Sequence, residues 1–242
     1  MNKLLINHIN LYCPISRASI YQNGTVVLHR ARSRQEKRAP KIKRGQVKTL
    51  SKQSLSKAVF VVSETFIIFT SVVTVTYGKN VPTDGKAVKK HLHNFLQKIR
   101  YHFGSFEYLW WLEFQRRGAP HFHILLTLEA NKENRYLLAE LWVKATNEYK
   151  TPEMLRVHRH KKTFETIRKG DNAKRYLTWY TGKQRQKRVP KNYVNVGRFW
   201  GASKAVKNSI PDPVTVPMTD DQIRELYPRL AALPLLPKII YG

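Results

Sequence analysis

The sequence predicts an α+β fold in which an antiparallel sheet carries helices on one face. Three observations support this prediction. The expected elements follow the order strand, helix, hairpin, helix; the strand segments alternate along the chain; and two long segments carry apolar residues at helical spacing with lysines on the opposite side. Helices on one face of such a sheet leave its other face open to solvent or ligand.

The first ordered elements are expected to be a short helix and a strand. Ser51 or Ser54 can cap a helix that runs to about Ser63, because a serine oxygen accepts a hydrogen bond from the first turn. Phe66–Tyr77 alternates and is rich in β-branched residues, which is typical of a buried strand. Pro82–Gly85 has the composition of a turn.

Two amphipathic helices are expected to flank a hairpin. Apolar residues recur at helical spacing over Lys86–Tyr101 and again over Lys132–Glu148. Between them, the strands Glu107–Gln115 and His121–Leu128 are joined by a turn at Arg116–Pro120. This order gives the sheet its predicted antiparallel pairing.

The chain divides into three parts. A central domain is expected over residues 51–205, between a basic extension over residues 1–50 and a tail over residues 206–242. In the extension, Ile20–Leu28 predicts a small hairpin that turns at an Asn-Gly pair. The tail is punctuated by proline, and Thr219–Leu230 is compatible with one more short helix.

The charge balance indicates a polyanionic partner. The chain holds 44 Lys and Arg against 16 Asp and Glu, which gives a net charge of +28. Self-repulsion of this size destabilises a compact state unless a polyanion neutralises it, and nucleic acid is favoured over an anionic membrane surface. The basic segment Arg30–Lys52 is expected either to hold phosphates or to be a solvated linker.

The chain is expected to be a cytoplasmic protein without a membrane partner. Its single cysteine, Cys13, excludes an internal disulfide and a cysteine-based zinc site. The apolar stretch Ala58–Tyr77 contains Glu64, many Ser and Thr and only short apolar runs. A helix followed by a strand explains it better than a membrane span.

A pair of histidines on a strand predicts a metal site. His121 and His123 are two residues apart, so their imidazoles lie on the same face of the strand. Two neutral imidazoles side by side chelate a divalent ion. The His-x-His triplets that begin at His91 and His158 lack this context, since one lies in a helical pattern and the other in a basic stretch without alternation.

A carboxylate is expected to join the pair. If the turn is centred on Gly118, the antiparallel partner of His123 is Glu113 and that of His121 is Gln115. Direct partners share a face, so Glu113 lies with both histidines. Two imidazoles and one carboxylate suit Mg²⁺ or Mn²⁺ when the substrate supplies phosphate oxygens, and the ligand types do not exclude zinc.

The opposite face of the hairpin gives a consistency check, because it carries only apolar side chains. These are Trp110, Leu112, Phe114, Phe122, Ile124 and Leu126. The alternative is that the histidines are polar residues on a solvated face and that Glu113 pairs with Arg116 or Arg117.

A second constellation follows in a predicted helix from Asp171 or Asn172 to about Lys183. Tyr176 and Tyr180 are four residues apart and so lie on one helical face. A phenol with a pKa of about 10 is ionised in only about one molecule in a thousand at neutral pH, a deficit of about 4 kcal/mol. It attacks a phosphodiester only if a lysine and a metal ion stabilise the developing charge. Packing is the alternative role of these tyrosines.

Four segments resemble rolling-circle replication initiators of the HUH endonuclease superfamily, in its phage and plasmid branch. Val73–Tyr77 is similar to their first motif, Tyr108–His123 to the metal motif and Tyr176–Lys183 to the tyrosine motif. Gly197–Gly201 also recurs in that branch. The similarity covers roughly residues 50 to 205.

The resemblance implies a ferredoxin-like or RRM-like palm that nicks single-stranded origin DNA at a specific site. It implies a 5′-phosphotyrosine intermediate, a free 3′-OH that primes synthesis, and strand transfer by the reverse reaction. Carried over by position, the metal ligands are Glu113, His121 and His123, the nucleophile is Tyr180 or Tyr176, and the helper is Lys183. Basic residues within these segments or beside them are expected to contact DNA: Arg116, Arg117, Lys174, Arg175 and Arg198.

One departure from the family pattern bears on the nucleophile. Many relatives have lysine just before the second tyrosine, where this chain has Trp179. Tyr180 with Lys183 is therefore the better-preserved pair. The sequence also contains no P-loop, so strand separation is expected to need a host or phage helicase, and extension a DNA polymerase.

Other interpretations stay open. A single-strand transposase or a relaxase would share the chemistry, although relaxases commonly carry a third histidine where this chain has Glu113. A non-catalytic RNA- or DNA-binding protein with a similar sheet would bind without cleavage and without metal.

Overall fold

The computed structural model divides into two compact units, which are treated separately below. One comprises Gly45–Pro211, and the other combines Met1–Arg44 with Asp212–Gly242. The structure describes residues 16–23, 25–29, 46–148, 152–167, 188–219, 221–226 and 240–241.

The larger unit is built on a five-stranded antiparallel sheet with the strand order β6-β3-β5-β4-β7. The strands are β3 (Ser71–Thr76), β4 (Tyr108–Phe114), β5 (Pro120–Leu126), β6 (Phe164–Thr166) and β7 (Trp200–Ala202). With helices after β3 and β5, the first four strands give the β-α-β-β-α-β pattern of a ferredoxin-like fold. The predicted α+β class is therefore confirmed, and β5 is the central strand.

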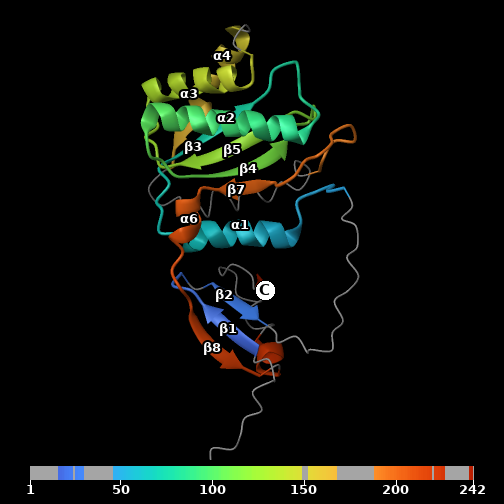
Figure 1. Cartoon of the computed structure of the whole chain (residues 1–242), viewed down its shortest axis with the longest axis vertical. Coiled ribbons are helices and arrows are strands. Elements are labelled where there is room, and N and C mark those ends of the chain that lie inside the picture. Colours follow the sequence, from blue (N-terminus) through green and yellow to red (C-terminus); the bar gives the residue numbers. More distant parts are fainter. Residues whose placement is uncertain are drawn as a thin grey trace, which may run out of the picture. The chain divides into compact units, whose positions relative to one another are not determined.

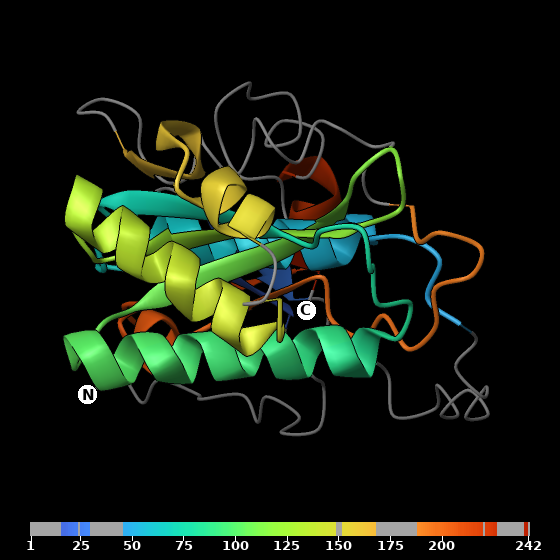
Figure 2. The same ribbon diagram turned by 90° about the horizontal axis from the view of Figure 1, so that it is seen from above.

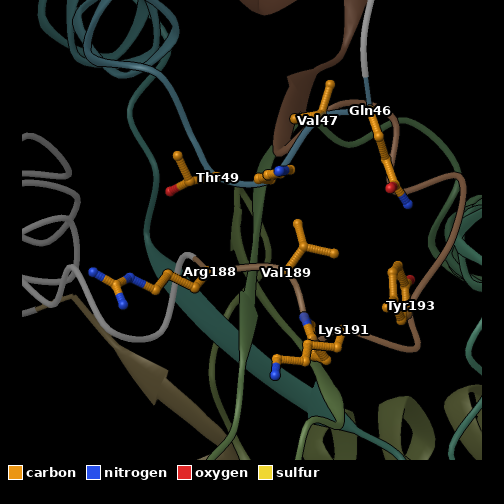
Figure 3. A pocket seen from close by; sticks show the side chains of 9 residues that line it. Gln46, Val47, Thr49, Arg188, Val189, Lys191 and Tyr193 are labelled. Atoms are coloured by element: carbon orange, nitrogen blue, oxygen red, sulfur yellow. The ribbon is translucent and has the colours of Figure 1, made fainter.

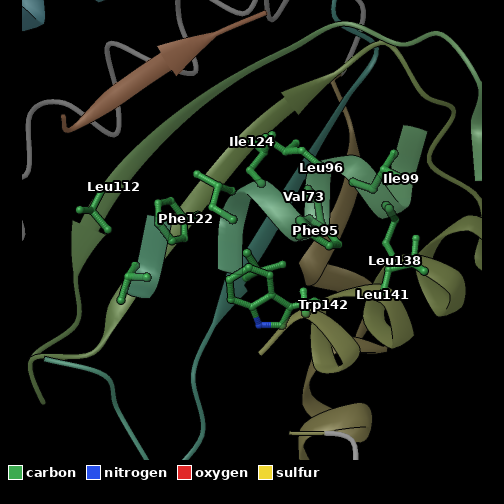
Figure 4. Packing of buried hydrophobic residues seen from close by; sticks show 14 of the residues in the cluster. Val73, Phe95, Leu96, Ile99, Leu112, Phe122, Ile124, Leu138, Leu141 and Trp142 are labelled. Atoms are coloured by element: carbon green, nitrogen blue, oxygen red, sulfur yellow. The ribbon is translucent and has the colours of Figure 1, made fainter. Parts of the chain in front are cut away.

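Helices α2 (Gly85–Phe103) and α3 (Lys132–Ala145) lie side by side on one face of this sheet (Figures 1 and 2). Both were expected, and α2 begins where a turn was predicted because Asp84 accepts a hydrogen bond from the backbone N–H of Lys86 and caps the helix. Trp142 of α3 is fully buried against the sheet, and its indole N–H donates to the carbonyl of Thr76 at 2.6 Å. Figure 4 shows the side chains around it; they include Val73, Phe95, Ile99, Phe122, Ile124 and Leu138.

The other face of the sheet is partly covered, which corrects the expectation that it stays open. Helix α1 (Lys52–Glu64) begins after Ser51, as predicted, since the Ser51 hydroxyl accepts from the N–H of Ser54. In Figure 1 it lies on the side of the sheet opposite α2 and α3. The apolar cluster it shares with the sheet contains Ala58, Val61, Val62, Phe69, Val72, Leu109, Trp111, Leu125 and Val206 of α6 (Lys204–Asn208). The outward strand residues of this cluster are too apolar to remain in water, so a helix covers them.

Two further predictions about elements were wrong. The strand expected from Phe66 begins only at Ser71, and Phe66 and Ile68 are exposed before it. The basic loop after α3 contains the helix α4 (Pro152–His158), the 3-10 helix η1 (Lys161–Thr163) and β6. Such short elements depend on contacts distant in sequence, here the pairing of β6 with β3. The helix predicted from Asp171 or Asn172 to Lys183 lies outside the described residues.

The smaller unit contains the predicted hairpin, formed by β1 (Ser16–Ile20) and β2 (Val26–His29). Strand β8 (Val214–Met218) pairs with β1, and β9 (Ile240–Tyr241) pairs in parallel with β2. Residues 221–226 are helical, within the predicted Thr219–Leu230 segment. The N-terminal and C-terminal parts of the chain thus share one sheet.

No helix in the described ranges is long and apolar enough to cross a bilayer.

We expect Gly201→Ala to destabilise the larger unit by about 1–3 kcal/mol, because the added methyl would overpack the edge of the sheet. A Cβ at this position would meet three atoms of the Trp110 indole at 2.9 Å. Urea unfolding followed by tryptophan fluorescence measures the change. Ala202→Gly, which removes a methyl from the next residue, is the matched control for an altered edge strand. Equal stability of Gly201→Ala and the wild type would contradict the close packing.

Candidate metal centre

Strand β5 places two imidazoles beside each other on the face of the sheet opposite α2 and α3. The ring centroids of His121 and His123 are 4.6 Å apart, and the rings meet edge to face at 79°. Between them in sequence, Phe122 is fully buried on the other face. The pairing expected from the alternation of the strand is therefore observed.

The register of the β4–β5 hairpin differs from the prediction by two residues. Glu113 lies opposite His121, and Trp111 lies opposite His123. The turn is not centred on Gly118: its N–H donates to the carbonyl of Gln115 at 2.8 Å, and Gly118 adopts a positive φ of 82°. This is a tight turn followed by one left-handed residue, which glycine adopts without strain. A shift by two residues preserves the faces, so Glu113 still shares the face of the histidines.

A buried ion pair forms the inner part of the site. Glu113 Oε2 lies 3.3 Å from His123 Nε2, and the side chains are only 3% and 4% exposed. The other ring nitrogen of His123, Nδ1, is 3.0 Å from the hydroxyl of Thr74 on β3, and the indole of Trp111 stacks on the ring at 5.2 Å. These contacts fix the imidazole so that Nε2 faces the carboxylate.

The outer part of the site is His121, which is half-buried. Its Nδ1 lies 3.3 Å from Nε2 of Gln115, and Oε1 of Gln115 accepts from Nε of Arg117 at 2.9 Å. The same guanidinium donates to the carbonyls of Tyr77 and Gly78. Arg117 therefore ties the hairpin turn to the end of β3 and fixes the amide that contacts His121.

The donor set fits a divalent ion, with one adjustment. Ligand atoms at right angles on a metal with bonds of about 2.1 Å are about 3 Å apart, close to the distance between Glu113 and His123. A metal-bound histidine donates its other N–H to an oxygen, which Thr74 offers to His123. At His121 the amide of Gln115 would have to rotate so that its oxygen accepts. In the described conformation and ranges, no group of three or more His, Cys, Asp or Glu side chains is arranged to hold a metal ion.

Several predicted site residues lie outside the described residues: Tyr176, Tyr180, Lys183, Lys174 and Arg175. Among the other predicted DNA contacts, Arg116 and Arg198 are exposed. The segment that contains Arg198 has a structural role that the sequence did not reveal. The carbonyl of Phe199 accepts from the N–H of Leu112 at 2.7 Å, and β7 then pairs along β4.

Three residues of the site were missed: Thr74, Gln115 and Arg117 as an internal tether. Thr74 is the direct partner of His123 on β3. Its place could have been found from the alternation of β3, in which polar Thr74 and Thr76 fall between buried valines. The tether could not, because it depends on the end of β3 lying next to the hairpin turn.

The site lies in a segment that matches a known family. Residues 70–185, slightly less than half of the chain, match a family model described as replication-associated protein ORF2. This match supports a replication initiator family. The matched segment includes the strands that carry Glu113, His121 and His123. No curated protein and no solved structure matches the chain.

We expect Arg117→Ala to destabilise the larger unit by about 1–2 kcal/mol, because it removes the hydrogen bonds between the hairpin turn and the end of β3. Urea unfolding is the measurement. The control is Arg116→Ala at the neighbouring exposed position, which should change stability by less than about 0.5 kcal/mol. Equal effects of the two substitutions would contradict the tether.

Proposed function

We propose that this replication initiator is a metal-dependent endonuclease that nicks single-stranded origin DNA and starts rolling-circle replication. The buried pair of Glu113 and His123 beside His121, on the central strands of a palm within the matched segment, carries this proposal. Buried charges are costly, and a cluster of this kind on a sheet face is more typical of a site than of a packing arrangement.

Three side chains would hold the ion, which we propose to be Mg²⁺ or Mn²⁺: Glu113, His121 and His123. When bound, the ion polarises the scissile phosphate and offsets charge on its non-bridging oxygens. The contacts of Thr74 with His123 and of Gln115 with His121 orient the two rings.

The nucleophile in this proposal is the Tyr180 phenol, with Tyr176 as the second candidate. The phenol oxygen attacks phosphorus and loses its proton as the new P–O bond forms. The bond to the 3′ oxygen breaks, and that oxygen leaves as a 3′-OH after taking up a proton. The Lys183 ammonium stabilises the negative charge that develops at the phosphate.

The covalent product stores the energy of the broken phosphodiester. Attack of a 3′-OH on the 5′-phosphotyrosine would rejoin a strand and release the tyrosine, so two tyrosines permit nicking and rejoining in succession. A separate helicase and a DNA polymerase would then separate and copy the strands, since the sequence contains no P-loop.

The tyrosine assignment predicts a covalent adduct. With Mn²⁺ and 3′-labelled single-stranded oligonucleotides that tile the DNA around the gene, one oligonucleotide should become linked to the protein and run with it on a denaturing gel. Tyr180→Phe should reduce the adduct, and the double variant with Tyr176→Phe should abolish it, because a phenyl ring has no oxygen to attack. Tyr136→Phe, on the exposed side of α3, is the matched control. Adduct formation by the double variant would refute the assignment.

The metal assignment predicts that binding and cleavage separate. His121→Ala should lower cleavage by about 100-fold or more while DNA affinity changes by less than about threefold, since phosphate contacts supply the affinity. EDTA should have the same effect on the wild type. The control is His93→Ala, an exposed histidine of α2. Tight binding with no cleavage by the wild type in any metal would instead indicate a non-catalytic nucleic-acid-binding protein.

A further inference from the structure

A basic pocket lies between two segments that are far apart in the sequence. Residues 46–49 form one side and residues 188–193 the other, around a volume of about 450 Å³ (Figure 3). Ligand sites of proteins commonly enclose about 300–1,000 Å³. Every lining residue lies outside residues 70–185, so the pocket is a feature of this chain beyond the matched family segment.

Backbone pairing holds the two sides together. Thr49 and Arg188 form an antiparallel bridge, and the N–H of Val189 donates to the carbonyl of Lys48 at 2.9 Å. At the closed end, the N–H of Tyr193 donates to the carbonyl of Pro190 at 3.0 Å. The pocket is therefore a built feature of the fold.

The pocket borders the turn that belongs to the metal centre. The Pro190 ring, which lines the pocket, lies 3.5 Å from the position that a Cβ on Gly118 would occupy. Gly118 closes the β4–β5 turn, which also carries Gln115 and Arg117. A strand of DNA bound across the histidine face would thus run close to the pocket.

The lining combines an apolar wall with exposed cations. The wall consists of Val47, Val189, Pro190 and the ring of Tyr193, which is held edge-on by Phe114 at 4.9 Å. Burial raises the pKa of Tyr193, so its phenol stays neutral and can donate a hydrogen bond. Lys48, Arg188 and Lys191 are exposed at the rim, and no acidic side chain is among the described residues that line the pocket.

We propose that this pocket binds one unpaired nucleotide of the single-stranded DNA substrate. The base would lie against the apolar wall, where Gln46 and Thr49 can hydrogen-bond its edge, and the rim cations would hold the flanking phosphates. A base inside a duplex cannot enter such a pocket without leaving the stack, so the pocket favours single strands. This inference rests on the proposed action on single-stranded DNA.

Two variants test the wall and the rim separately. Val47→Trp fills the pocket without a change of charge, at a side chain that is 46% exposed and so tolerant of substitution. The triple variant Lys48→Ala, Arg188→Ala, Lys191→Ala removes the rim cations. The control triple variant Lys86→Ala, Lys90→Ala, Lys144→Ala removes the same charge from exposed positions of α2 and α3. Binding of fluorescent (dT)20 and of a 20-base-pair duplex is measured by anisotropy in EDTA, over a range of salt concentrations.

The wall and the rim have different expected signatures. Val47→Trp should weaken (dT)20 binding about tenfold, as expected for the loss of one stacked base, with duplex binding and the salt slope unchanged. The rim variant should weaken binding by about 10- to 100-fold at 0.1 M salt and lower the salt slope by about 2, at about 0.7 for each lost phosphate contact. The control variant should lower the slope by less than the rim variant.

The outcomes separate this inference from the proposed function. Unchanged (dT)20 binding by Val47→Trp, or an equal loss for the duplex, would overturn the pocket. If the thermal melt shows that Val47→Trp is unfolded, the rim variant decides, and a loss equal to that of the control variant would overturn it. Because these measurements contain EDTA, they stand whether or not the wild type cleaves DNA, and absence of cleavage alone counts against the proposed function.

Discussion

The pairing of β5 on both of its edges is the constraint on which the rest of the larger unit depends. The strand is hydrogen-bonded to β3 and to β4, so its pleat cannot rotate. Phe122, Ile124 and Leu126 anchor one face in the core formed with α2 and α3. Their burial forces His121 and His123 to the opposite face, since a slip by one residue would place the imidazoles in the core. The site is thus held by the same contacts that hold the fold.

The second face of the sheet combines a covered and a chemical part. Helix α1 buries the outward apolar side chains of the sheet, among them Leu109, Trp111 and Leu125. Trp111 also stacks on His123, so the inner histidine lies at the margin of this second core. Burial on that side keeps water from the pair of Glu113 and His123, while His121 remains half-exposed. A protein with a net charge of +28 brings a polyanion to such a face over a long range.

Sequence patterns predicted elements well where local signals agree with the tertiary structure. Ser51 caps α1, and the amphipathic patterns of α2 and α3 correspond to helices that differ from the expected bounds by a few residues at their ends. The patterns failed where long-range contacts decide. Phe66 and Ile68 continue the alternation of β3, yet Thr70 is the first of this run to bond β5, so the strand begins late. The elements between α3 and residue 167 carry no periodicity that could reveal them.

The sequence by itself determined the faces: the period of two along β4 and β5 fixes which residues point to the core and which to the site. It also determined the residue types of the site and the strongly basic character of the chain. Only the tertiary structure decided the register, because the left-handed residue at Gly118 displaces the pairing by two positions. It also decided which residues orient the rings and that residues 46–49 meet residues 188–193 in one pocket. Those features depend on contacts between segments far apart in the chain, and no local pattern encodes them.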